Sequence, residues 1–339
     1  MRKLLATMMA VAALGLATTG ARAEADKVRI SFNPQIYSYL PLFLAIDKGY
    51  FKEQNLDVEV STYGGSALSQ IPMLARGDQD IAGMVTGPGF FNQKAEGFGV
   101  KLIASLAQAK KGWHDTMWVM VRKDVWDTGK IKTYADLKGL TIEGGPKGSP
   151  VYLTSTQAIQ QGGLTMKDVT FTERLRAVSD ALPIFRNKAA DVLTMVEPIA
   201  GRLVSEGLAV RWLPSYEVMP WFQESFLAAN PKFLTEKRAV TKRFLLAYFK
   251  GLKEVTDGGG KWSPDMIASV VKWSKMPNDV ITAIPGPQNV SQMGLIDLKS
   301  IERLQKIWMD AGLVKEKTPI NELVDTSILD EVRAELKIK

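Results

Sequence analysis

The chain repeats a stretch of its own sequence at a constant spacing of 111 residues, and this repeat constrains the fold more than any other feature. Residues 57–85 read DVEVSTYGGSALSQIPMLARGDQDIAGMV and residues 168–196 read DVTFTERLRAVSDALPIFRNKAADVLTMV. The two copies align over their whole length without a gap. Six of the 29 positions are identical, including Asp80 with Asp191. Such self-similarity indicates one supersecondary unit used twice. Each copy reads strand, helix, strand, so we expect two similar α/β lobes with a cleft between them.

The start of the chain is typical of a secretory signal peptide. Arg2 and Lys3 precede an apolar run, and Ala21-Arg22-Ala23 forms a small-x-small cleavage site. The run is shorter than the roughly 20 apolar residues that a membrane span needs. We therefore expect residues 1–23 to be removed and the mature chain to begin at Glu24.

Charge and cysteine content narrow the cell compartment and the partners. Loss of the three basic residues of the signal peptide would lower the formal charge from +7 to +4, and no basic run carries interleaved aromatic residues. Nucleic acid is therefore not expected as a partner. The chain has no cysteine, which excludes disulfides and lipid attachment through an N-terminal cysteine. An exported protein without an anchor is retained only inside an outer membrane, so we expect a periplasmic protein.

Apolar periodicity predicts strands that alternate with helices, which favours mainly parallel sheets flanked by helices. In the first lobe, strands are expected at 28–32, 57–62, 80–85 and 100–107, and helices from Pro41 and at 66–76 and 88–95. In the second lobe, strands are expected at 116–122, 140–143, 168–172, 191–196 and 208–213, and helices at 150–161, 178–188 and 198–206. The chain from 230 onward is expected to be helical.

Two crossings should connect the lobes and act as a hinge for closure around a ligand. The chain is expected to leave the first lobe near 108–115 and to return near 214–223. The length of 339 residues agrees with two domains. The division that follows places 24–112 with 216–339 in lobe 1 and 113–215 in lobe 2.

The catalytic and metal-binding residue types that the sequence contains favour binding over catalysis. His114 is the only histidine, and without cysteine neither a thiol nucleophile nor a zinc site of the common types is available. Gly87-Pro88-Gly89 lacks the third glycine of a dinucleotide fingerprint, and the lysine in the glycine-rich run 144–149 does not stand where a P-loop requires it. We expect no metal and no cofactor.

The segment PLFLAIDKGYF at 41–51, followed by LDVEV at 56–60, resembles the periplasmic solute-binding proteins of ABC importers. The resemblance is to the nitrate, sulfonate and taurine group, which includes NMT1/THI5-like binders of thiamine-pyrimidine precursors. It spans most of 26–330, with further matches in LARGDQDIA at 74–82, DLKG at 136–139, GL at 163–164, DV at 168–169 and at 191–192, and EP at 197–198.

This resemblance implies an α/β, two-lobed periplasmic-binding-protein fold of type II that closes on a small solute. It also implies delivery of that solute to an inner-membrane ABC permease with its cytoplasmic ATPase, and we expect a monomer. Related eukaryotic enzymes that make the thiamine pyrimidine depend on a cysteine-rich motif. The absence of cysteine therefore argues against an enzyme of that type.

Ligands of open parallel sheets bind beyond the carboxyl ends of strands, and the repeat locates those ends twice. This reasoning selects candidate site residues that follow strands of the two lobes: Asn33, Gly65, Ser66, Thr86, Gly87, Ser149, Arg176 and Glu197. Ser66, Thr86 and Ser149 precede helices, whose free N–H groups attract an anion, although plain helix capping is the alternative.

Aromatic and charged residues complete the candidate set. Tyr37 and Tyr39 follow the first strand and could form part of the wall of the pocket, with simple surface packing as the alternative. Trp113 and Trp221 fall at the two crossings, where packing between lobes is the competing explanation. Either Arg176 or its neighbour Arg174 could clamp a carboxylate or sulfonate, since arginine presents a rigid fork of hydrogen-bond donors. Glu197 would need a cationic or N–H partner if buried, whereas the alternative is a helix start near solvent.

The leading hypothesis is a solute-binding component of an ABC importer that captures a sulfonate, a carboxylate, or an aromatic or heteroaromatic compound. The first alternative is an enzyme of the pyrimidine-synthesis type. The second is a protein that presents a ligand to a membrane sensor without transporting it.

Overall fold

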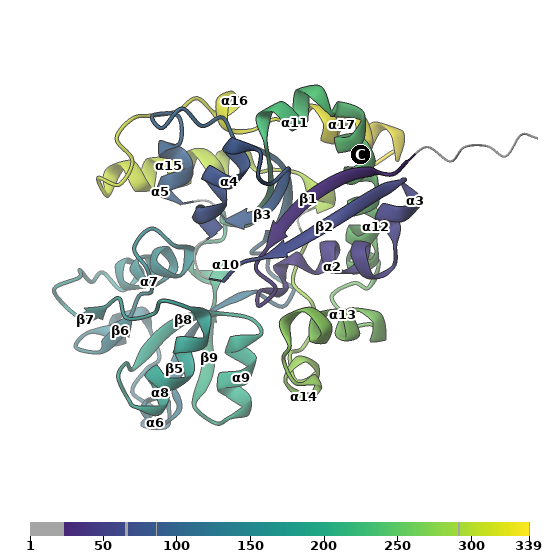
Figure 1. The fold of residues 1–339 in the computed structure, drawn as a ribbon. Helices are drawn as coiled ribbons and strands as arrows, with labels where there is room; N and C mark the ends of the chain where they lie inside the picture. The colour runs from purple at the N-terminus through teal and green to yellow at the C-terminus, as the bar shows by residue number, and fades with distance from the viewer. Residues whose placement is uncertain (1–23, 65–66, 86, 291, 339) are drawn as a thin grey trace, which may run out of the picture.

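The computed structural model describes residues 24–64, 67–85, 87–290 and 292–338, which form two α/β lobes (Figure 1). The strands of lobe 1 are β1 (Asp26–Phe32), β2 (Leu56–Thr62), β3 (Ile81–Val85), β4 (Lys101–Gln108) and β10 (Gln223–Ala229). The strands of lobe 2 are β5 (Met117–Arg122), β6 (Thr141–Glu143), β7 (Thr170–Thr172), β8 (Val192–Val196) and β9 (Ala209–Pro214). Residues 1–23, the predicted signal peptide, lie outside the described residues.

Helices fill the connections between strands. Lobe 1 contains η1 (Tyr37–Tyr39), α2 (Leu40–Asp47), α3 (Tyr50–Glu53), η2 (Ala67–Ser69), α4 (Gln70–Arg76) and α5 (Pro88–Asn92). Lobe 2 contains α6 (Lys123–Trp126), η3 (Tyr134–Leu137), α7 (Pro150–Gln161), η4 (Val178–Asp180), α8 (Ala181–Arg186) and α9 (Ile199–Ser205), and α10 (Ser215–Val218) lies in the return crossing. The C-terminal part contains α11 (Pro231–Glu236), α12 (Arg238–Asp257), α13 (Pro264–Ser274), α14 (Asn278–Thr282), η5 (Gln292–Gly294), α15 (Leu298–Asp310), α16 (Ile320–Leu323) and α17 (Ser327–Glu335).

The two sheets have the same topology, as the internal repeat predicts. The strand order is β2-β1-β3-β10-β4 in lobe 1 and β7-β6-β8-β5-β9 in lobe 2, so each strand of one sheet has a counterpart at the same place in the other. The central strands β3 and β8 are separated by the same 111 residues as the sequence copies, and so are η2 and η4. The repeated sequence therefore builds the same supersecondary unit twice.

The identical aspartates of the repeat make the same contact in both lobes. Asp80 Oδ2 accepts a hydrogen bond from the backbone N–H of Arg29 at 2.8 Å, and Asp191 Oδ2 accepts one from the backbone N–H of Thr141, also at 2.8 Å. In each lobe the aspartate directly before the central strand thus secures the neighbouring parallel strand. This shared contact gives a physical reason for the identity of the two residues.

Both sheets are mixed, because one strand in each runs against its neighbours. β10 is antiparallel to β3 and β4, and β5 is antiparallel to β8 and β9, whereas the other pairs are parallel. The sequence predicted no strand at 223–229. Every residue of β10 is buried, so the strand lacks the alternation of apolar and polar residues that marks a half-exposed strand. The other expected strands are present within a few residues of their predicted ends.

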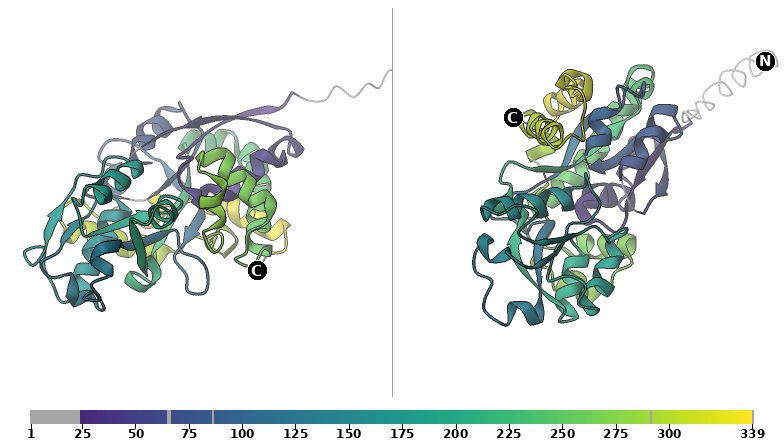
Figure 2. Two further views of the ribbon diagram at one scale, coloured as in Figure 1. Left: turned by 90° about the horizontal axis from the view of Figure 1, so that it is seen from below. Right: turned by 90° about the vertical axis from the view of Figure 1, so that its left-hand side faces the viewer.

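The C-terminal helices pack mainly on lobe 1. Val240, Phe244, Tyr248 and Leu252 of α12 are buried, as their four-residue spacing predicts, and α12 packs against α2. The right-hand view of Figure 2 shows the last helices, in yellow, at the lobe 1 end of the molecule. One short helix reaches lobe 2, because α14 packs against α9. Among the residues described, no helix is both long enough and apolar enough to cross a membrane.

The two crossings between the lobes are tied to each other by hydrogen bonds. The first crossing joins β4 to β5, and the second joins β9 to β10. Buried Asp115 of the first crossing accepts hydrogen bonds from the Ser215 hydroxyl at 2.9 Å and from the backbone N–H of Tyr216 at 2.9 Å in the second. The sequence places the boundaries between the lobes at 112–113 and 215–216. These boundaries stay a prediction.

Asp80→Ala and Asp191→Ala are each expected to lower the free energy of unfolding by about 1–3 kcal/mol, because each leaves a strand N–H without its acceptor. Urea denaturation followed by circular dichroism measures the change. Asp57→Ala is the matched control, since Asp57 is exposed at the repeat's first identical position. The control should change stability by less than about 0.5 kcal/mol. Equal losses in all three variants would contradict the assignment.

Candidate functional site

A cavity of about 360 Å³ lies between the two lobes. It is lined at the carboxyl ends of strands in both sheets, where sequence reasoning places a ligand. From lobe 1 these positions are Asn33 after β1, Tyr63 after β2 and Val85 at the end of β3, and from lobe 2 they are Ser149 after β6, Arg176 after β7 and Val196 at the end of β8. The cavity therefore sits where the two copies of the repeat face each other.

Two tyrosines form a polar and aromatic wall on the lobe 1 side. The Tyr63 hydroxyl donates to the Gly83 carbonyl at 2.7 Å and lies 3.5 Å from the Tyr39 hydroxyl. Burial raises the pKa of both phenols, so both are neutral at physiological pH. The Tyr39 ring can lie against β3 because Gly83 has no side chain. A Cβ at this position would come within 2.5 Å of the ring. Gly83 is thus required for the position of this wall.

Glu224 of β10 is a buried carboxyl group that lines the cavity. The Thr116 hydroxyl, in the first crossing, donates a hydrogen bond to Glu224 Oε2. Burial raises the pKa of Glu224 to about 7, and the hydrogen bond from Thr116 opposes that rise. The carboxyl group therefore changes its charge close to neutral pH, inside the cavity and beside the hinge.

The lobe 2 wall carries positive charge and a helix N-terminus. The N-cap of α7 is Ser149, whose hydroxyl accepts a hydrogen bond from the Tyr152 N–H at 3.1 Å. The exposed side chains of Lys147 and Arg176 also line the cavity. Free N–H groups and the helix dipole favour an anion at such an end. This wall is therefore suited to a negatively charged group.

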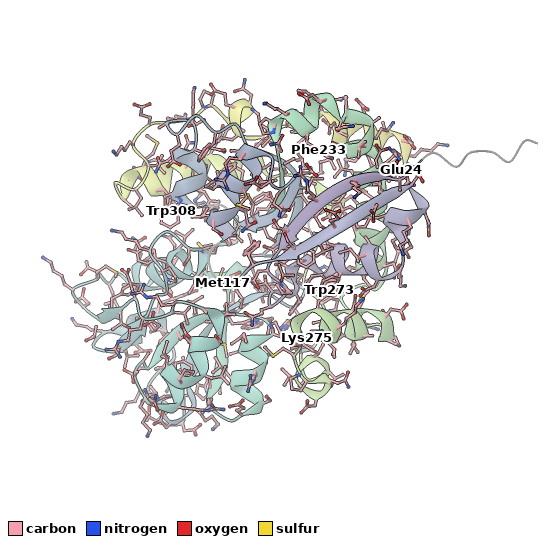
Figure 3. All side chains as sticks on the ribbon, viewed as in Figure 1. Glu24, Met117, Phe233, Trp273, Lys275 and Trp308 are labelled. Carbon is pink, nitrogen blue, oxygen red and sulfur yellow. The ribbon has the colours of Figure 1, made fainter. Side chains whose placement is uncertain are left out.

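Two glycines beside the cavity form a close contact between the lobes. A Cβ at Gly87 would lie 2.7 Å from the Gly148 carbonyl oxygen, and one at Gly148 would lie 2.9 Å from Pro88 Cδ. Both distances are shorter than a carbon atom tolerates. A further contact between lobes places the Tyr152 ring of α7 6.4 Å from that of Trp308, which Figure 3 labels on α15.

The structure brings part of the candidate set together. Asn33, Tyr39, Ser149 and Arg176 line the cavity, and Gly87 lies at the contact between the lobes beside it. Arg174 is exposed and does not belong to the lining, so Arg176 is the arginine that faces the cleft. Three further candidates, Gly65, Ser66 and Thr86, lie outside the described residues.

The other candidates lie away from the cavity lining. Tyr37 is buried and packs edge-on against Trp262 with ring centroids 5.7 Å apart, and Trp113 packs beside Gly260. The Trp221 ring lies 4.3 Å below the guanidinium carbon of Arg303. Of these three contacts, that of Trp113 with Gly260 joins the lobes as the sequence divides them, whereas the contacts of Tyr37 and Trp221 lie within lobe 1. A part for these residues in binding stays a prediction.

Glu197 is buried with partners supplied by the protein itself. Its carboxylate accepts hydrogen bonds from Arg211 Nε at 2.8 Å and from the Gly201 N–H at 2.7 Å, and it lies 3.0 Å from His114 Nε2. The sequence correctly required a cationic or N–H partner for a buried Glu197. The partners are Arg211, Gly201 and His114 of the chain itself. Glu197 does not line the cavity, whereas its neighbour Val196 does.

Sequence reasoning missed Glu224 and Tyr63. Glu224 lies on the one strand that the apolar pattern did not reveal, so nothing placed it at a strand end. Tyr63 directly follows β2, and the rule that ligands bind beyond strand ends could have selected it together with Gly65 and Ser66.

Comparisons with known proteins agree with this geometry. A family model described as NMT1/THI5 like matches residues 37–258. YtlA of Bacillus subtilis (strain 168), which is named as a candidate binding protein, is 25% identical over 320 residues that cover 91% of this chain and 90% of YtlA.

Solved structures show the same fold at lower identity. The periplasmic aliphatic sulphonate binding protein SsuA from Escherichia coli matches with a TM-score of 0.70 and 18% identity over 88% of this chain and 92% of its own. The periplasmic nitrate-binding protein NrtA from Synechocystis PCC 6803 matches with a TM-score of 0.74 and 14% identity over 93% and 90%. The desulfurization enzyme DSZB matches with a TM-score of 0.65 and 14% identity over 92% and 99%. The fold is therefore the two-lobed α/β fold of periplasmic binding proteins, and a protein named as an enzyme shares it.

Glu224 should make stability depend on pH between about 4.5, its ordinary pKa, and about 7. In that interval the folded state holds a proton that the unfolded state releases, so the free energy of unfolding falls as pH rises. Glu224→Gln removes this dependence. As the pH rises from 4.5 to 8, the difference in free energy of unfolding between variant and wild type should change by on the order of 3 kcal/mol in favour of the variant. Urea denaturation at both pH values measures the difference, and a constant difference would contradict the assigned pKa.

Proposed function

Because the chain belongs to the NMT1/THI5-like family, we propose that it is the periplasmic solute-binding component of an ABC importer. The observation that carries this proposal is the cavity lined by both lobes. A cavity between two hinged lobes can enclose a small molecule when the lobes approach and release it when they separate. In this function the protein captures a small organic solute and delivers it to an inner-membrane permease.

Features at the N-terminus and in the composition support export. The first 23 residues have the pattern of a cleaved signal peptide, and the chain has no cysteine for lipid attachment. The mature protein is then a monomer that diffuses in the periplasm between the outer membrane and its permease.

Charge in the cavity supports an anionic solute such as a sulfonate or a carboxylate. Lys147, Arg176 and the N-terminus of α7 all lie on the lobe 2 wall. The names of SsuA and NrtA, which bind a sulphonate and nitrate, agree with an anion. Among the described lining residues, Glu224 is the only carboxylate, and burial favours its neutral form.

A thermal-shift screen of the mature protein tests this function. The panel contains alkanesulfonates, aromatic carboxylates and sulfonates, nitrate and pyrimidines. A true solute at about 100 times its dissociation constant stabilises by roughly 2.7 kcal/mol, which raises the melting temperature by several degrees. A panel without any shift, together with turnover of one of the same compounds, would instead support an enzyme.

Gly87→Ala should weaken solute binding without destabilising the open protein. The added methyl group would lie 2.7 Å from the Gly148 carbonyl, so the lobes could not close fully. Overpacking of this kind costs about 1–3 kcal/mol, which corresponds to a loss of affinity of roughly 5- to 150-fold.

Gly89→Ala is the matched control for this variant. Its methyl group would lie 3.6 Å from Leu68 Cδ1, which is an ordinary contact. Isothermal titration calorimetry measures both affinities with a solute from the screen. Equal affinities of the two variants would exclude closure at this contact.

A further inference from the structure

The charged side chains of the cavity are separated by depth and by lobe. Lys147 and Arg176 of lobe 2 are exposed, whereas Glu224 of lobe 1 is 3% exposed and lies beside the hinge. No ion pair joins Lys147 or Arg176 to a carboxylate among the described residues. The open end of the cavity is therefore cationic, and its deep end carries a single carboxyl group.

The carboxyl group of Glu224 retains unused hydrogen-bonding capacity. Among the described residues, its only hydrogen bond comes from the Thr116 hydroxyl, which donates to Oε2. Oε1 receives no donor from the part of the chain that the structure describes, and it is not among the unpartnered side-chain atoms that are closed off from solvent. Water in the cavity can therefore reach Oε1, and a ligand that displaces this water must supply an O–H or N–H group in its place, since an unpartnered polar atom costs free energy.

The wall between these two ends is mostly apolar. Ile36, Leu68 and Val85 contribute to it from lobe 1, and Val151, Leu175 and Val178 contribute from lobe 2. A solute that spans the cavity must therefore present an apolar body to these side chains. An anion as small as nitrate would leave this surface uncovered.

We propose that the cavity takes an amphipathic organic anion that carries a hydrogen-bond donor at the end opposite its acidic group. The acidic group lies toward Lys147, Arg176 and the N-terminus of α7, the apolar body fills the middle, and the donor meets Glu224. Aromatic carboxylates or sulfonates with a distal hydroxyl or amino group have this chemistry. The inference rests on the proposed function and narrows the class of solute.

Matched solutes test the donor directly on the wild-type mature protein. The donor-bearing probes are 4-hydroxybenzoate, 4-aminobenzoate and 4-hydroxybenzenesulfonate, and their partners without a donor are benzoate, 4-methylbenzoate and benzenesulfonate. Isothermal titration calorimetry should show about 3- to 100-fold tighter binding of the donor-bearing solute in each pair, which is the range for a hydrogen bond to a carboxyl group in its neutral or ionised form.

Two variants test which residue binds each end of the solute. Glu224→Leu should abolish the preference for the donor-bearing member of each pair, because leucine has a similar volume but accepts no hydrogen bond. Arg176→Ala should weaken both members of a pair equally, and Arg174→Ala, two residues away and outside the lining, should weaken neither.

The outcomes separate this inference from the proposed function. Equal binding within every pair, or a preference that survives in Glu224→Leu, overturns the inference. Binding of only nitrate or alkanesulfonates also overturns it but leaves the solute-binding function intact. If no solute of either panel binds, the proposed function itself fails. The comparison on the wild-type protein decides the matter even if Glu224→Leu does not fold.

Discussion

The buried carboxyl group of Asp115 is the interaction on which the relation between the lobes depends. It lies in the first crossing and accepts one hydrogen bond from the Ser215 hydroxyl, which lies within reach of both carboxylate oxygens, and one from the Tyr216 N–H in the second. It also accepts one from the Met117 N–H at 3.3 Å, where lobe 2 begins its first strand. Hydrogen bonds between the two crossings favour their movement together, which is what hinge closure of two lobes around a ligand requires.

The repeat gives this hinge two matching surfaces to bring together. Since both sheets have the same order, the carboxyl ends of β1 to β3 and of β6 to β8 stand at the same edge of their lobes. The two walls are nevertheless not equivalent in chemistry. Lobe 1 presents two tyrosine hydroxyls and a carboxyl group, whereas lobe 2 presents cations and a helix N-terminus. A duplicated fold has thus acquired two complementary halves of one site.

Much of this arrangement could be predicted from sequence, because it depends on local pattern and on the repeat. The helix at 150–161 and its Ser149 cap follow from Ser-Pro at a helix start, and Arg176 follows from its place after β7. The strand β10 could not be predicted in the same way, since its burial on both faces comes from β3 and β4, which are distant in sequence. Glu224 was missed with it. Glu197 shows the complementary limit: the sequence indicated that a buried carboxylate needs a partner but could not show that Arg211 and His114 supply it.

The contact between Gly87 and Gly148 has a consequence for how such a protein can change its cargo. The two lobes meet there at a glycine carbonyl and a proline ring, and no charged side chain takes part in this contact. Under the proposed function, the same contact can form whichever solute the cavity encloses. Substitutions of lining residues such as Lys147, Arg176 or Glu224 would then change which solute binds while the contact between the lobes stays the same.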